Sequence, residues 1–230
     1  MIAPVELFLF DLDDPPPEEA PGWLAPAERE RANRFATVLL RRRYTAGRAM
    51  LRRLLAERTG TRPAAVALVE DPDGKPRLAD DARAFNLGHA GRHALVAIGP
   101  AGMRIGVDIE ELRAVVDLET LVPTCLTLPE RAEFEAIADE ASRREAFLRL
   151  WVRKEACLKA IGKGLRIEPT AFAVGLAPPA ADWPARVHDA RLRVTDLDPG
   201  LAGLAAAIAV AGVDTMPRLA PLSRIGWPAG

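Results

Sequence analysis

Hydrophobic residues follow two different patterns along this chain, one typical of strands and one typical of helices. Short apolar runs bounded by turn residues predict strands at residues 5–10, 66–69, 94–98 and 203–210. Apolar residues that recur every three or four positions predict two long helices, over residues 41–59 and 143–161. This pattern predicts a mixed α/β (α+β) fold.

The predicted elements recur at a similar offset. The two helices begin 102 residues apart, and two glycine-led apolar strands, Gly91–Ile98 and Gly203–Val210, begin 112 residues apart. A loosely duplicated unit fits both offsets. The last stretch, residues 216–230, is rich in proline and lacks periodicity, which predicts a loosely attached tail.

Composition narrows the possible classes of protein. With 230 residues, of which 49% are hydrophobic and 27% charged, the chain has the balance of a globular protein of one or two domains, not of a disordered or multispanning one. A net charge of −1 argues against a general nucleic-acid or membrane-surface binder. The two cysteines lack a metal-binding spacing and the N-terminus does not resemble a signal peptide, so we expect a cytoplasmic protein.

The net charge conceals a basic block. Between Glu28 and Arg58, ten arginines accompany three acidic residues, a local balance of +7. The arginines flank an apolar helical seam, so they do not form a disordered tail. Two interpretations stay open: a solvated helix face, or an anion site, because guanidinium groups bind phosphate with paired hydrogen bonds.

The segment from Ile105 to Glu110 carries the first specific chemistry. Alternation in a strand places Asp108 and Glu110 on one face, about 6.6 Å apart at ~3.3 Å per residue, where both can reach one hard cation. Gly106 on that face would leave room for a phosphate. The alternative is a half-exposed strand whose acids face water.

The predicted helix over residues 143–161 carries the second group of residues with specific chemistry. Lys154 falls inside its apolar stripe, so its ammonium must snorkel, pair or meet an anion. Glu155 and Lys159 are four residues apart at the edge of the stripe, facing a cleft or forming a helix salt bridge. Upstream, Asp73-Gly74 predicts a tight turn with Lys75 at its tip, and His89 lies in an expected short polar loop.

These groups together favour a magnesium-bridged pyrophosphate, because the three acids suit Mg²⁺, and the cation and the neighbouring lysines would neutralise the charge of the pyrophosphate. The chain has no GxxxxGK[ST] phosphate loop, and nothing points to a Ser-His-Asp triad.

At these residues the chain resembles a known family. GVDIE and, 40 residues later, WVRKEACLKAIGKGL resemble the paired signature of the 4′-phosphopantetheinyl transferases, in the larger monomeric branch that activates peptide and polyketide synthases. LAPAERERANRF, RRRYTAGRAML, DGKP and FNLGHAGR match upstream in the same order, so the resemblance covers roughly residues 5–212.

The resemblance implies roles for residues, position by position. Asp108, Glu110 and Glu155 would hold Mg²⁺ on the pyrophosphate of coenzyme A, with Asp108, Glu155 and Lys159 as the catalytic residues. Glu155 would take the proton of the attacking serine, and Lys159 would neutralise the leaving group. The remaining implied contacts of coenzyme A are Arg31, Arg43 and His89 for the 3′-phosphate, Gly74, Lys75 and Pro76 for the adenine end, and Lys154, which with Trp151 completes the motif. Glu130 matches an acid often found near the metal.

The chain departs from the family pattern at three positions. Gly88 and Ala90 flank His89 where relatives carry serines, and Glu28 stands where relatives often have lysine. These departures bear on coenzyme A affinity more than on catalysis.

The resemblance implies two similar half-domains about a pseudo-twofold axis, which we place at residues 1–104 and 105–215. It implies a cytoplasmic, monomeric enzyme of secondary metabolite biosynthesis that moves phosphopantetheine from coenzyme A to a serine of an acyl or peptidyl carrier protein, with Mg²⁺ as cofactor. The partners would be the carrier protein and coenzyme A, with no nucleic acid or membrane. Two alternatives are a coenzyme A-binding module without transfer activity and a Mg²⁺-dependent coenzyme A pyrophosphohydrolase.

Overall fold

The computed structural model describes residues 3–112, 117–176 and 182–228. In these residues the strands are β1 (Val5–Asp11), β2 (Leu68–Glu70), β3 (Pro76–Leu78), β4 (Arg83–Ala90), β5 (His93–Pro100), β6 (Arg104–Glu111), β7 (Trp183–Val187), β8 (Ala190–Leu197), β9 (Leu204–Ala211) and β10 (Leu219–Arg224). They form one four-stranded sheet in the order β10-β1-β5-β4, a second in the order β6-β9-β8-β7, and the small pair β2-β3.

The helices are α1 (Ala20–Trp23), α2 (Pro26–Asn33), α3 (Val38–Thr59), α4 (Leu118–Cys125), α5 (Leu128–Glu135) and α6 (Glu140–Ile161), with 3₁₀ turns at Pro63–Ala65, Gly164–Arg166 and Pro169–Ala171. The two long helices have matched ends. Thr37 and Asp139 cap their N-termini with side-chain hydrogen bonds, and Gly60 and Gly162 end them in the left-handed conformation.

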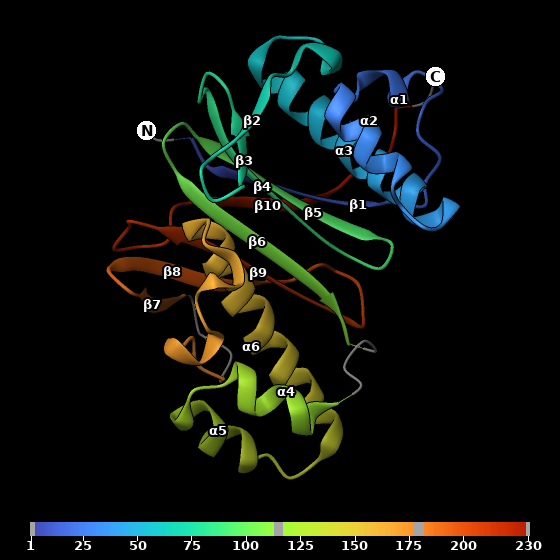
Figure 1. Ribbon diagram of the computed structural model, residues 1–230. Coiled ribbons are helices and arrows are strands. Elements are labelled where there is room, and N and C mark those ends of the chain that lie inside the picture. Colours follow the sequence, from blue (N-terminus) through green and yellow to red (C-terminus); the bar gives the residue numbers. More distant parts are fainter. Residues whose placement is uncertain (1–2, 113–116, 177–181, 229–230) are drawn as a thin grey trace.

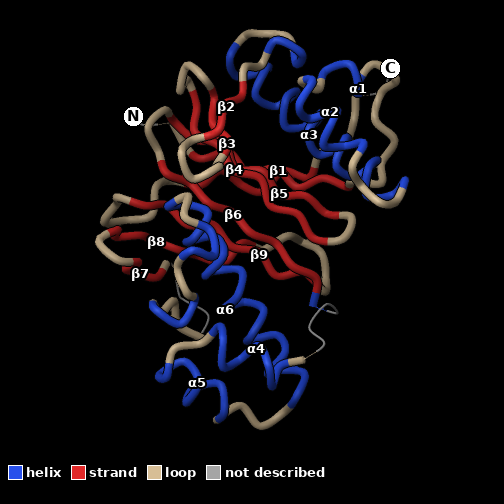
Figure 2. The backbone as a smooth tube through the Cα atoms, viewed as in Figure 1, coloured by secondary structure: helices blue, strands red, loops and turns tan. Residues whose placement is uncertain are grey.

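The long helices and the two sheets form four layers (Figure 1). One face of the first sheet packs on α3, and one face of the second packs on α6. The other faces of the two sheets meet, where β1 contributes Val5, Leu7 and Leu9 and β6 contributes Ile105, Val107 and Ile109. Figure 2 shows the strands gathered at the centre with helices on either side. The apolar half of the predicted alternation in β6 is therefore confirmed.

Both halves of the chain follow the same path. In the first half, β1 pairs antiparallel with β5, which pairs antiparallel with β4. In the second, β6 pairs antiparallel with β9, which pairs antiparallel with β8. A long helix follows the first strand in each case, and α3 and α6, both of 22 residues, begin 102 residues apart. The predicted fold of two similar α+β halves is confirmed.

The expectation of a loose C-terminal tail is wrong. Residues 219–224 form β10, which pairs in parallel with β1. Beyond it, the Ile225 N–H donates to the Leu9 carbonyl at 2.9 Å, and Trp227 packs on Trp23. Pro221 is tolerated because β10 is an edge strand, and the missing periodicity reflects its half-exposed position.

The expected loop around His89 is also wrong, because His89 lies within β4 and pairs with Ala94. Asn86 and Gly88 make this strand difficult to predict from the sequence, since both residue types are depleted in strands. None of the helices described is long and apolar enough to cross a membrane.

Candidate active site

The free edges of the two sheets meet where β4 crosses β6. An edge strand exposes backbone groups that need partners. Asn86 of β4 supplies one, because its Oδ1 accepts a hydrogen bond from the Val107 N–H at 2.8 Å. Gly88 permits this approach, since a Cβ there would lie 3.0 Å from the Val107 carbonyl oxygen and 3.2 Å from the Asp108 Cα. Sequence reasoning missed Asn86, because its segment reads as a polar loop and not as the strand that it forms.

The other side of β6 lies against α6. A Cβ on Gly106 would come within 2.0 Å of the Ala156 carbonyl oxygen and 2.3 Å of the Ala160 nitrogen. The expectation that Gly106 makes room for a phosphate is therefore wrong, because the helix backbone occupies that space. The close approach brings Asp108 to α6, where the Lys159 ammonium donates to its Oδ1 at 2.6 Å.

Three carboxylates gather around this contact. Burial and then the charge of Asp108 raise the pKa of Glu110 to about 7. The same two causes raise the pKa of Glu155, and burial raises that of Asp108 against the opposing effect of Lys159. Asp108 is only 4% exposed, and its Oδ2 has no hydrogen-bond partner in the described structure. The protein alone therefore does not fully compensate the negative charge of these three carboxylates.

The donor chemistry of this set fits a hard cation. All three groups offer oxygen ligands, one buried oxygen is unpaired, and mutual repulsion raises the cost of ionising them together. Within the residues described, no three acidic, histidine or cysteine side chains already stand as a ready-made metal cage. Mg²⁺ usually keeps several waters and binds proteins through one or two carboxylates plus phosphate, so a preformed cage is not required.

His89 and Trp151 border the carboxylates. Burial and the nearby Lys159 ammonium hold the pKa of His89 below its usual value. The Trp151 side chain hydrogen-bonds to Glu110. The structure thus brings His89 and Trp151 together with Asp108, Glu110, Glu155 and Lys159, although the sequence spreads them over more than 70 positions.

The Lys75 side chain does not point to an open ligand site. Its ammonium donates to the carbonyl oxygens of Ile105 at 2.8 Å, Lys159 at 2.7 Å and Ala160 at 3.3 Å, and burial lowers its pKa to about 8. Gly74 supplies the positive φ of the turn that presents Lys75, and Pro76 then starts β3. Lys75 therefore joins the halves, because it caps the C-terminal end of α6 and the edge of β6.

We expect Lys75→Met to lower the free energy of unfolding by about 2 kcal/mol, because it leaves buried carbonyl groups without a donor. Urea unfolding followed by circular dichroism measures this loss. Lys163→Met is the matched control, because the Lys163 ion pair with Asp73 is half exposed and should contribute less than about 1 kcal/mol. Equal stabilities of the two variants would refute the conclusion that Lys75 joins the two halves.

Most arginines of the basic block contact other side chains of the protein itself. Arg43 forms two hydrogen bonds with Asp13, both at 2.7 Å, and Arg31 lies over the Tyr44 ring, 5.6 Å from its centroid. Other arginines of the block pair with glutamates: Arg34 with Glu30, Arg48 and Arg52 with Glu28, Arg53 with Glu57, and Arg58 with Glu6. The solvated-face interpretation is too simple, and the assignment of Arg31 and Arg43 to a phosphate stays a prediction.

The structure explains why a glutamate stands at position 28, which the sequence around it does not reveal. Its Oε2 accepts a hydrogen bond from the Ala25 N–H at the start of α2 and from Arg52 at 2.6 Å. The side chain is buried, and the arginines outweigh the effect of burial, so its pKa is lowered. A lysine here would face two arginines.

Lys154 and Glu130 lie in the core, away from the carboxylates of β6. Their side chains are 0% and 2% exposed and 2.8 Å apart. The Lys154 ammonium also donates to the carbonyls of Pro169 and Phe172, and Glu130 accepts from the Val174 N–H. Of the options that the sequence left open for Lys154, pairing is the one observed. The structure does not bring Lys154 or Glu130 to the site that the resemblance implied.

Glu110 yields a prediction about stability and pH. Because its folded pKa of about 7 lies above the ordinary 4.5, ionisation destabilises the folded state as pH rises from about 4.5 to 7, and the penalty is complete above that range. Glu110→Gln should therefore raise the melting temperature of the metal-free protein at pH 8 but not at pH 4.5. Thermal unfolding at both pH values tests this, and a lower melting temperature of the variant at pH 8 would contradict it.

Comparisons with known proteins agree with the resemblance. A sequence profile of the 4′-phosphopantetheinyl transferase superfamily matches residues 104–208, and one described as 4′-phosphopantetheinyl transferase, N-terminal, matches residues 18–101. The 4′-phosphopantetheinyl transferase HetI of Nostoc sp. is 34% identical over 221 residues, which cover 93% of this chain and 90% of that protein.

Two further similarities are partial. The human L-aminoadipate-semialdehyde dehydrogenase-phosphopantetheinyl transferase is 29% identical over 67% of this chain and 53% of its own length. A solved structure of Thermotoga maritima holo-[acyl-carrier-protein] synthase aligns with 47% of this chain and 63% of its own at a TM-score of 0.38 and 22% identity, too weakly to support an argument.

Proposed function

This chain belongs to the 4′-phosphopantetheinyl transferase superfamily, in its larger two-domain branch, and from that premise we propose its reaction. It moves the 4′-phosphopantetheine arm of coenzyme A to a serine of an acyl or peptidyl carrier protein and releases adenosine 3′,5′-bisphosphate, with Mg²⁺ as cofactor. The observation that carries the proposal is the buried Asp108, paired with Lys159 through one oxygen and unpaired at the other.

Asp108, Glu110 and Glu155 are the residues that would hold the cation. Bound there, Mg²⁺ would neutralise and orient the pyrophosphate of coenzyme A. This supply of positive charge would relieve the repulsion that raises the pKa values of the three acids.

The protein side chains supply the remaining steps. Glu155, which lies beside Asp108 and Lys159, takes the proton of the carrier serine as the serine oxygen bonds to the phosphorus of phosphopantetheine. The bond from that phosphorus to the bridging oxygen of the pyrophosphate breaks. The departing adenosine 3′,5′-bisphosphate keeps the bond electrons, and the Lys159 ammonium stabilises its charge.

We also propose that the chain acts as a cytoplasmic monomer in secondary metabolite biosynthesis, with half-domains at residues 1–104 and 105–215. The matching order of three strands in each half, β1-β5-β4 and β6-β9-β8, supports the division.

Product analysis separates the proposed transfer from the two alternatives. In the presence of an apo-carrier, coenzyme A and Mg²⁺, chromatography should show one adenosine 3′,5′-bisphosphate released per carrier modified. Without a carrier, no phosphopantetheine should be released. Release without a carrier would support the pyrophosphohydrolase, and coenzyme A binding without any product would support the binding module.

A further inference from the structure

Three large apolar side chains stand in a row on the surface at the start of α3. Val38, Leu39 and Leu40 are 63%, 47% and 45% exposed. Elsewhere in the described chain, only Val69 and Leu128 are large apolar residues with comparable exposure, and each stands alone in sequence. Single exposed apolar residues are ordinary, but a contiguous group marks a binding surface.

The duplicated fold provides an internal control for this observation. At the same offset of 102 residues, the first turn of α6 contains Glu140, Ala141 and Ser142. Both helices have the same length and the same type of N-terminal cap. The polar turn of α6 shows that this architecture does not need apolar residues at the start of the helix.

The charged residues near the start of α3 are also unfavourable for that helix. The first turn of α3 has no acidic residue, and three arginines follow it directly, whereas α6 begins with Glu140 beside its capping Asp139. Positive side chains near a helix N-terminus oppose the helix dipole. Arg43 is paired with Asp13, while Arg41 and Arg42 are exposed and form no ion pair within the described residues. The surface is therefore apolar and positively charged.

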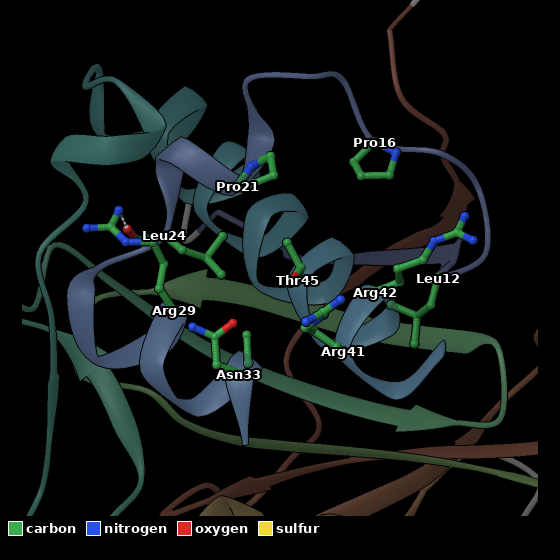
Figure 3. A pocket seen from close by; sticks show the side chains of 10 residues that line it. Leu12, Pro16, Pro21, Leu24, Arg29, Asn33, Arg41, Arg42 and Thr45 are labelled. Carbon is green, nitrogen blue, oxygen red and sulfur yellow. Dashed lines mark hydrogen bonds between the residues drawn. The ribbon is translucent and has the colours of Figure 1, made fainter. Parts of the chain in front are cut away.

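A cavity adjoins these arginines (Figure 3). It measures about 360 Å³, and Arg41, Arg42 and Thr45 line it from α3. Its apolar walls come from Leu12, Pro16, Pro21 and Leu24. An apolar side chain of a partner could enter this hollow while acidic residues beside it meet the arginines.

A chain of contacts connects this surface to the candidate active site. Arg43 lies one helical turn beyond Leu39 and pairs with Asp13, just after β1. Asp11 of β1 is the register partner of His93, whose Nδ1 lies 3.8 Å from Oε1 of Glu111, the residue after Glu110 in β6.

We propose that Val38, Leu39, Leu40, Arg41 and Arg42, here named the α3 patch, dock the carrier protein. The partner face is acidic, carries at least one exposed apolar side chain, and presents the serine to the carboxylates of β6. Charge complementarity selects this occupant, since a second copy of the same arginine-rich patch would repel it. The inference rests on the proposed function, because it assigns a docking surface to that reaction.

The double variant Leu39→Ser/Leu40→Ser tests the apolar part of the patch. We expect the KM for the carrier to rise about 10-fold or more, while the KM for coenzyme A and the kcat at saturating carrier stay within about twofold. Leu128→Ser on α5 is the matched control, because Leu128 is 76% exposed and α5 lies at the opposite end of the molecule from α3 (Figure 1). Both variants should keep the wild-type melting temperature, since the side chains changed are exposed.

The variant Arg41→Ser/Arg42→Ser tests the charged part, and it should weaken the dependence of the carrier KM on salt. Binding of a fluorescent apo-carrier, measured by anisotropy without coenzyme A, separates docking from transfer. If the wild type binds the carrier and the leucine variant does not, the docking surface stands whether or not transfer occurs. A leucine variant that binds and modifies the carrier as the wild type does overturns the inference while leaving the proposed function intact.

Discussion

Replacing Asp108 with alanine is expected to lower kcat for carrier modification by about 10²–10³-fold. Asp108 is the most buried of the three proposed metal ligands, and its unpaired Oδ2 is the oxygen best placed for a cation. Removing it also takes from the Lys159 ammonium the carboxylate that positions it. Steady-state kinetics with a saturating carrier measures the effect.

Unfolding cannot account for this loss. Burial makes the ionised Asp108 unfavourable in the metal-free protein, so the alanine variant should melt no lower than the wild type. Asp214→Asn is the control, because Asp214 is 76% exposed in its pair with Arg191. Wild-type kcat in Asp108→Ala would remove the metal assignment.

Lys154→Met is expected to lower the free energy of unfolding by about 3–5 kcal/mol, since it strands a buried carboxylate on Glu130. It also removes the donor to two backbone carbonyls. Urea unfolding measures the loss. The double variant Lys154→Met/Glu130→Gln should recover part of it, because the glutamine is neutral and still accepts from the Val174 N–H.

Lys159→Met is expected to lower kcat as well as stability. Lys159 itself is 28% exposed, but its loss leaves the buried Asp108 without its ion-pair partner and removes the charge that stabilises the departing group. If Lys154→Met kept wild-type stability but raised the KM for coenzyme A, Lys154 would be a ligand residue after all, as the resemblance implies.

Local patterns predicted the elements and part of the site. Alternation in β6 separated its apolar and acidic faces correctly because a strand has a fixed period of two. The apolar stripe of α6 identified Lys154 as a buried lysine and placed Glu155 and Lys159 on one edge. These inferences needed only residues close together in the chain.

Contacts between the halves were beyond such patterns. Lys75 and Asn86 satisfy the edge of β6 from 30 and 21 residues away, and nothing local marks either as a partner of that strand. The same holds for β10, whose pairing partner β1 lies at the other end of the chain. Gly106 shows the limit most clearly, because the sequence gives its face but not the helix that fills the space.

Intact-mass spectrometry of an apo-carrier incubated with coenzyme A, Mg²⁺ and the protein tests the central claim. The account predicts that the wild type adds one phosphopantetheine to the carrier serine, that a chelator blocks the reaction, and that Asp108→Ala leaves the carrier unmodified over the same time. A panel of acyl and peptidyl carriers that all stay unmodified by the wild type, or modification by Asp108→Ala at the wild-type rate, would contradict it.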